Sequence, residues 1–199
     1  DLVRAALAAE GLPLSAPPVA ALDTGVCVVL VEPSAERSFV TTQGAERQIT
    51  VQSLAASNPV PGDLVCVSGY SLVGRTRDPL VEWLDTLADG VVVVLDPGAT
   101  FAGLAEPLRD RVLARTDVWT GNADEAAALT GVRGMREAAE VVATLLAPDA
   151  VTIVRDGARG CAVRESGRTT HCPGHPQRPV DTNGAAIPSL TAGLYTVTP

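Results

Sequence analysis

Short apolar runs alternate with amphipathic segments along most of this chain. The runs are rich in valine and are bounded by glycine, proline and aspartate, as is typical of buried strands. Strands are predicted at residues 62–68, 90–96, 117–120, 150–155 and 161–165. Helices are predicted at residues 1–10, 79–87, 107–115, 123–129 and 135–146. This alternation predicts an α/β fold with a mostly parallel sheet and right-handed crossovers.

A second pattern lies nearer the N-terminus. Residues 25–32 and 37–42 are β-rich runs, and residues 33–36 between them have the composition of a turn. We predict a small β hairpin over residues 26–41 that projects from the main sheet. The alternative is that these two runs extend that sheet.

Length and charge narrow the class of protein. The chain has 199 residues, enough for one domain with its own core. No apolar run is long enough to span a bilayer, and the first residues lack a signal-peptide pattern, so we expect a cytoplasmic protein without a membrane partner. A net charge of −8 without a basic cluster argues against nucleic-acid binding. All 15 basic residues are arginine, which excludes a Walker A loop and a Schiff-base lysine.

The four cysteines form no Cys-x-x-Cys pair. Cys27, Cys66 and Cys161 lie in apolar strand-like runs, where we expect them to act as small hydrophobic residues. The segment from His171 to His175 contains two histidines and Cys172, but its spacing matches no standard zinc pattern. We expect a surface loop there rather than a metal site.

Polar groups follow several predicted strands. Ligands of parallel α/β sheets bind beyond the carboxyl ends of the strands, so these groups are candidates for one site. They are Asp96-Pro97-Gly98, Asn122 with Glu125, the segment from Asp156 to Gly160, and the segment from Asp181 to Ala186. Several of them also have a structural explanation. Asn122 suits a helix cap, Glu125 a first helical turn, and Asp156-Gly157 a hairpin turn.

The stretch from Val180 to Ala186 is the most suggestive of them. Asp181, Thr182 and Asn183 favour turns and helix N-caps, and the small residues that follow leave backbone amides uncovered. Such a helix start is an anion site, since bare amides and the helix dipole both favour negative charge. An ordinary capped helix is the alternative.

The segment Asp181-Thr182-Asn183-Gly184-Ala185 resembles the start of the Asp-Thr-x-Gly-Ala-Gly-Asp signature of ribokinase-like (PfkB) carbohydrate kinases. The resemblance implies that Gly184, Ala185 and Ala186 form the anion hole for the transferred phosphate. Asp181 and Asn183 would lie near a monovalent cation such as K⁺. The chain departs from the signature at its end. Ala186 replaces a glycine, and Ile187 occupies the position of the catalytic aspartate base.

Other segments resemble the same family in the same order. Thr120 to Ala126 is similar to its Asn-x-x-Glu element, which implies that Asn122 and Glu125 organise Mg²⁺ and phosphate, Glu125 only indirectly. Asp156-Gly157-Ala158-Arg159-Gly160 is similar to the glycine-bearing turn beside the nucleotide phosphates, which implies phosphate binding by Asp156, Gly157 and Gly160. Thr24-Gly25 and Glu36-Arg37 sit where the family builds a β lid over the sugar.

The resemblance implies an ATP-dependent sugar kinase that transfers the γ-phosphoryl group to a sugar hydroxyl. Its cofactors would be ATP, Mg²⁺ and K⁺, and its partners a sugar, ATP and a second copy bound through the lid. We expect residues 1–199 to form a single domain fragment, with lid elements at about 19–42 and the α/β core at about 60–199. We expect the family's first strand and its adenine-site helices to have no counterpart within residues 1–199. The alternative is a non-catalytic remnant or nucleotide-binding pseudo-kinase, which Ile187 favours because isoleucine cannot accept a proton.

The abrupt loss of the signature suggests a shifted reading frame from Ala185 or Ala186 onward. The family continuation Ala-Gly-Asp-Thr-Phe-Thr can be written GCN GGC GAT ACC TTC ACT. Deleting the N gives GCG GCG ATA CCT TCA CT, which reads Ala-Ala-Ile-Pro-Ser-Leu, as at residues 185–190. A genuinely diverged tail is the alternative. In either case we expect residues 187–199 to pack poorly.

Overall fold

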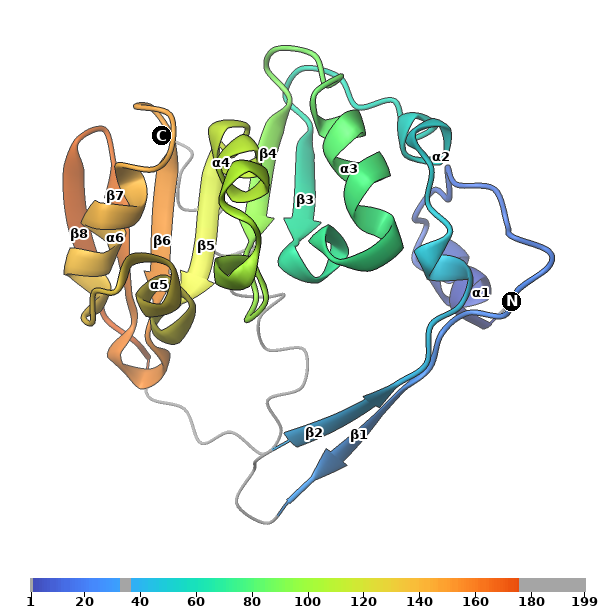
Figure 1. Cartoon of the computed structure of the whole chain (residues 1–199), viewed down its shortest axis with the longest axis horizontal. Helices are drawn as coiled ribbons and strands as arrows, with labels where there is room; N and C mark the ends of the chain where they lie inside the picture. The colour runs from blue at the N-terminus through green and yellow to red at the C-terminus, as the bar shows by residue number, and fades with distance from the viewer. Residues whose placement is uncertain (1, 33–36, 176–199) are drawn as a thin grey trace. The chain divides into compact units, whose positions relative to one another are not determined.

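The computed structural model describes residues 2–32 and 37–175 (Figure 1). Its contacts separate two compact units. The first comprises residues 1–60 and 71–88, and the second comprises residues 61–70 and 89–199. Each unit has its own secondary structure.

A six-stranded sheet is the centre of the second unit (Figure 1). Its strands, in spatial order, are β3 (Leu64–Ser68), β4 (Val92–Asp96), β5 (Val118–Asn122), β6 (Val151–Arg155), β7 (Cys161–Glu165) and β8 (Arg168–Cys172). The pairs from β3 to β6 are parallel, and β7 and β8 join antiparallel to them. The mostly parallel α/β sheet predicted from the sequence is therefore confirmed.

Three helices of this unit lie in front of the sheet in Figure 1: α4 (Glu106–Ala114), α5 (Ala123–Thr130) and α6 (Met135–Ala143). Helix α6 packs against β6 and β7. The side chains of Leu95, Trp119 and Val142 are completely buried in the core. Valine-rich segments form these strands because β-branched side chains pack well on the surface of a buried sheet. This core holds the strand ends, and hence the candidate site, in fixed register.

The first unit contains α1 (Leu2–Ala9), α2 (Val51–Ala55), α3 (Arg77–Leu84) and an antiparallel hairpin. The hairpin strands β1 (Cys27–Val31) and β2 (Arg37–Thr41) form a two-stranded sheet of their own, as the sequence predicts. Every residue of both strands is exposed. Because side chains alternate between the faces of a strand, the run Cys-Val-Val-Leu-Val makes both faces of β1 apolar.

Two features of the sequence analysis are corrected by the structure. Residues His171 and Cys172 belong to strand β8 rather than to a surface loop. Polar residues hide this strand from pattern analysis, but the turn at Ser166-Gly167, with φ of 47° and 78°, closes a tight hairpin onto β7. Cys27 and Cys66, expected to act as small hydrophobic residues, are exposed, and the Cys27 sulfur accepts a hydrogen bond from the Thr41 hydroxyl at 3.2 Å. In the described part of the chain, no helix is both long and apolar enough to cross a membrane.

A carboxylate that the sequence analysis did not single out ties together the chain next to the hairpin. Glu46 accepts the backbone N–H of Gly25 at 2.7 Å and that of Gly44 at 2.9 Å. Both hydrogen bonds lower the pKa of Glu46 from its usual 4.5, and the bond from Gly44 has the larger effect. The two glycines lack space for a side chain, since a Cβ on Gly25 would meet this carboxylate.

We therefore predict that Glu46→Gln destabilises the protein in a pH-dependent way. The glutamine amide retains one acceptor oxygen, but its NH₂ group cannot accept the second N–H. Because folding lowers the pKa of Glu46, the carboxylate stabilises the fold above pH 4.5, and this stabilisation disappears as the pH falls through the lowered pKa. Urea unfolding at about pH 7 and about pH 3 measures it. A difference between wild type and variant that is equal at both pH values would contradict the assignment.

Candidate active site

Helix α5 follows β5 directly, and a reciprocal pair of hydrogen bonds stabilises the junction between them. The Asn122 side-chain oxygen accepts the Glu125 backbone N–H at 2.8 Å, and Glu125 Oε2 accepts the Asn122 backbone N–H at 2.8 Å. This is a capping box, in which two amides at the helix start are satisfied by each other's side chains. Helix capping, the structural explanation of the Asn-x-x-Glu spacing, is therefore observed. Glu125 Oε1 takes no part in these two hydrogen bonds.

The surroundings of Glu125 are partly buried and charged. Burial raises the pKa of Glu125 above its usual value, and the Asn122 amide opposes this effect. Asp96 raises the pKa further, whereas Arg155 lowers it. Charges from the ends of β4 and β6 therefore act on a carboxylate that follows β5. These groups form one electrostatic cluster, as the positions of the strand ends predict.

The cap gives a direct stability prediction. Asn122→Ala removes the acceptor for the Glu125 amide and should lower the free energy of unfolding by about 1 kcal/mol. Asn122→Ser is the matched control, since serine keeps an oxygen at the cap and should cost clearly less. Chemical denaturation compares the two variants. If both lose the same stability, the hydrogen bond from Asn122 does not hold the helix start.

The turn after β6 is held by an ion pair. Arg159 donates two hydrogen bonds to the Asp156 carboxylate, at 2.7 and 2.8 Å. The intervening residues form one turn of 3₁₀ helix, Gly157–Arg159, and the Asp156 amide donates to the Gly160 carbonyl at 2.7 Å. Within the described residues, the amides of Gly157 and Ala158 have no acceptor. The turn is thus closed by hydrogen bonds, and the N–H groups of Gly157 and Ala158 are free to bind a ligand.

An ion pair links the carboxyl end of β6 to the carboxyl end of β4. Arg155 Nη2 lies 3.8 Å from Asp96 Oδ2 and 3.5 Å from the Thr120 carbonyl oxygen. The buried Arg155 Nε has no hydrogen-bond partner among the described residues. Sequence analysis did not assign a role to Arg155. The available signal was a charged residue closing an otherwise apolar strand, because a guanidinium in that position needs an anion.

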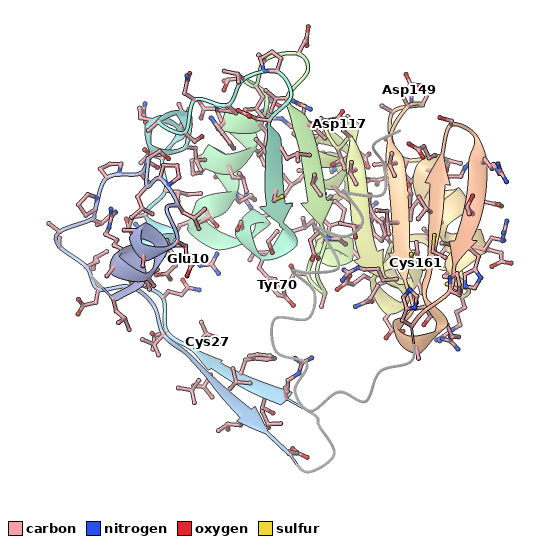
Figure 2. The ribbon with its side chains drawn as sticks, turned by 180° about the vertical axis from the view of Figure 1, so that it is seen from behind. Glu10, Cys27, Tyr70, Asp117, Asp149 and Cys161 are labelled. Atoms are coloured by element: carbon pink, nitrogen blue, oxygen red, sulfur yellow. The ribbon has the colours of Figure 1, made fainter. Side chains whose placement is uncertain are left out.

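The register of the sheet brings these groups together. Asn122 pairs directly with Arg155, so the capping box and the turn after β6 lie at neighbouring strand ends. Figure 2 shows Tyr70 and Cys161 near this edge, and Asp117 and Asp149 at the opposite edge. No three potential metal-ligating side chains cluster among residues 2–32 and 37–175. The remaining candidates lie outside the described residues: Asp181, Asn183, Gly184, Ala185, Ala186 and Ile187.

Comparison with known proteins decides the family. The model of the pfkB family carbohydrate kinases matches residues 1–185. The chain belongs to the pfkB family. These are ATP-dependent carbohydrate kinases. A relative, the uncharacterized sugar kinase YegV of Escherichia coli K12, is 36% identical over 126 residues, which are 63% of this chain and 39% of the relative.

Solved structures agree on the ribokinase-like fold. An Anopheles gambiae adenosine kinase, crystallised with P1,P4-di(adenosine-5) tetraphosphate, superposes with a TM-score of 0.81 at 21% identity. The match covers 100% of this chain and 64% of that kinase. A Vibrio cholerae O395 fructokinase with fructose, ADP and calcium gives a TM-score of 0.70 at 20% identity, covering 92% of this chain and 62% of that one. This pfkB chain therefore spans less than two thirds of each of these relatives.

Proposed function

We propose that this chain is the core of a sugar kinase that transfers the γ-phosphoryl group of ATP to a sugar hydroxyl. One observation carries the proposal. Two family elements far apart in sequence, Asn122 with Glu125 and the segment from Asp156 to Gly160, occur at neighbouring strand ends in a chain of the pfkB family. Phosphoryl transfer depends mainly on positioning and on charge stabilisation, which is what such a cluster supplies.

The residues at this edge fit a nucleotide phosphate. Uncommitted turn amides at Gly157 and Ala158 are anion-binding donors, and a Cβ on Gly157 would meet nothing within 4 Å, so the turn is open there. Arg155 keeps an unpaired buried Nε donor close by. We infer that Gly157 and Gly160 shape the phosphate-binding turn and that Asp156 holds it through Arg159.

Mg²⁺ would be bound to the protein largely through water molecules. Asp96 and Glu125 are carboxylates that interact with Arg155 at the start of the turn, and carboxylate oxygen is the ligand that Mg²⁺ prefers, commonly through retained waters. When bound, Mg²⁺ would neutralise charge on the phosphates. Glu125 would act indirectly, since its Oε2 already accepts the Asn122 amide.

We propose further that the catalytic base is absent. The family aspartate would accept the proton of the sugar hydroxyl, and Ile187 at that position has no atom able to do so. This favours a second candidate function, a non-catalytic nucleotide-binding remnant. Gly184, Ala185 and Ala186 remain our candidates for the anion hole, and Asp181 and Asn183 for a K⁺ site. A Vibrio cholerae fructokinase double mutant was crystallised with a potassium ion.

The hairpin is our candidate lid. Both of its faces carry exposed apolar side chains, such as Val28 and Leu30 on one face and Val29 and Phe39 on the other. One face could cover a sugar while the other packs against a second copy, so we propose a homodimer through the lid. The mass in solution, measured by analytical ultracentrifugation, tests it, and a monomer at high concentration would exclude it.

Calorimetric titration with ATP and Mg²⁺, combined with an assay for ADP release in the presence of a sugar panel, tests the proposed function. Saturable ATP binding without turnover is expected for the chain as written. Absence of ATP binding would refute the proposed nucleotide site. Rapid ADP release that depends on a sugar would refute the proposal that the catalytic base is absent.

A further inference from the structure

Two cysteines face each other across the last two strands of the sheet. Cys161 of β7 pairs directly with Cys172 of β8 in antiparallel register. Directly opposed residues project from the same face, with Cα atoms about 4.5–5.5 Å apart, which lies in the range that a disulfide requires. Both thiols are free in the structure. The backbone therefore already holds the two sulfur atoms on one side of one hairpin.

The two thiols differ in accessibility. Cys172 is exposed, whereas Cys161 is half-buried and packs against the apolar cluster that includes Val94 and Ile153. Burial, and then the neighbouring Cys172 thiol, raise the pKa of Cys161. A reagent from solution consequently reaches Cys172 first, with Cys161 behind it as the resolving thiol.

The pair is next to the turn that follows β6. Cys161 comes directly after Gly160, and a Cβ on Gly160 would overlap the carbonyl oxygen of Cys172. His171 Nε2 lies 2.9 Å from the Arg159 carbonyl oxygen. The end of β8 therefore rests on the backbone of this turn, so a covalent bond between the strands would act on the turn as well. Figure 2 labels Cys161 at this edge of the sheet.

We propose that Cys161 and Cys172 are a reversible redox modification site whose disulfide rigidifies the turn from Asp156 to Gly160. The oxidant is a low-molecular-weight disulfide. The Cys172 thiolate attacks one of its sulfur atoms, forms a mixed disulfide and releases one thiol, which takes up the proton lost by Cys172. The Cys161 thiolate then attacks the Cys172 sulfur and releases the second thiol. The protein loses two protons and two electrons, and the oxidant becomes two thiols. An effect on nucleotide binding rests on the proposed function.

Oxidation of the whole chain with glutathione disulfide tests the site. Peptide mapping should find an intramolecular Cys161–Cys172 cross-link, with a mass about 2 Da below the reduced pair, that dithiothreitol reverses. Hydrogen exchange at residues 156–160 should be slower in the oxidised form. Cys27→Ser should oxidise like the wild type, and Cys172→Ser should form no cross-link.

A stable glutathione adduct on Cys172, a cross-link between two chains, or equal hydrogen exchange of the turn in both forms would overturn the proposal. None of these measurements involves ATP. A cross-link with slower exchange in a protein that fails to bind ATP in either form would refute the proposed function and leave the redox site standing.

Discussion

Restoring one base to the codon for Ala185 and translating the gene in the new frame is expected to raise ATP-dependent sugar phosphorylation by about 10²–10⁴-fold. The regained aspartate would accept the proton of the attacking hydroxyl, which Ile187 cannot do. The regained glycine would bring a bare amide to the transferred phosphate in place of Ala186. A coupled assay of ADP release, with the chain as written beside the restored protein, measures the ratio.

The control for this experiment is the restored protein with its regained aspartate replaced by asparagine. Asparagine keeps the size of the side chain and removes its basicity, so the rate should fall back toward that of the chain as written. Equal rates for all three proteins would show that the base is not what this chain lacks. If the codons for residues 185–190 cannot be regrouped to Gly-Asp by a one-base change, the tail is a diverged one.

The second large effect is expected at Gly160. Its φ of +88° lies in the region that favours glycine, and a Cβ there would overlap the Cys172 carbonyl oxygen and crowd the Gly174 amide at 2.5 Å. Gly160→Ala should therefore lower the free energy of unfolding by about 3 kcal/mol or more. The backbone atoms it would strike cannot move without separating β8 from the turn. Urea denaturation of the purified variant measures the loss.

Gly157→Ala is the matched control in the same turn. Its φ is +53°, which strains an alanine by about 1–2 kcal/mol, but an added Cβ would meet nothing within 4 Å. It should therefore cost clearly less stability than Gly160→Ala. Equal losses for the two variants would mean that backbone strain alone, and not the contact with β8, sets the requirement for glycine.

The main sheet and the hairpin could be predicted because their signals are local. Valine-rich runs such as Val92–Asp96 indicate buried strands whatever their neighbours are, and the three-residue spacing of Asn122 and Glu125 predicts that they share one helix end. Strand β8 was missed because its residues, Arg168–Cys172, are mostly polar and gain their strand structure from pairing with β7.

Contacts between distant segments could not be read from the sequence. The approach of Arg155 to Asp96 depends on the order of strands in the sheet, and the bonds of Glu46 to Gly25 and Gly44 depend on the path of irregular backbone. The pairing of Cys161 with Cys172 depends on a register that a tight turn sets. Pattern analysis proposed the polar residues of the candidate site, whereas the topology determined which of them lie close together.

We propose that the ends of β5 and β6 bind the phosphates of a nucleotide. Amide chemical shifts of the ¹⁵N-labelled chain, recorded while ATP and Mg²⁺ are added, test it most directly. Saturable shifts are expected at the amides of Asn122, Gly157, Ala158 and Gly160, whereas those of Asp117 and Asp149 at the opposite ends of the strands should not change. Shifts confined to that opposite edge, or none at saturating ATP, would contradict it.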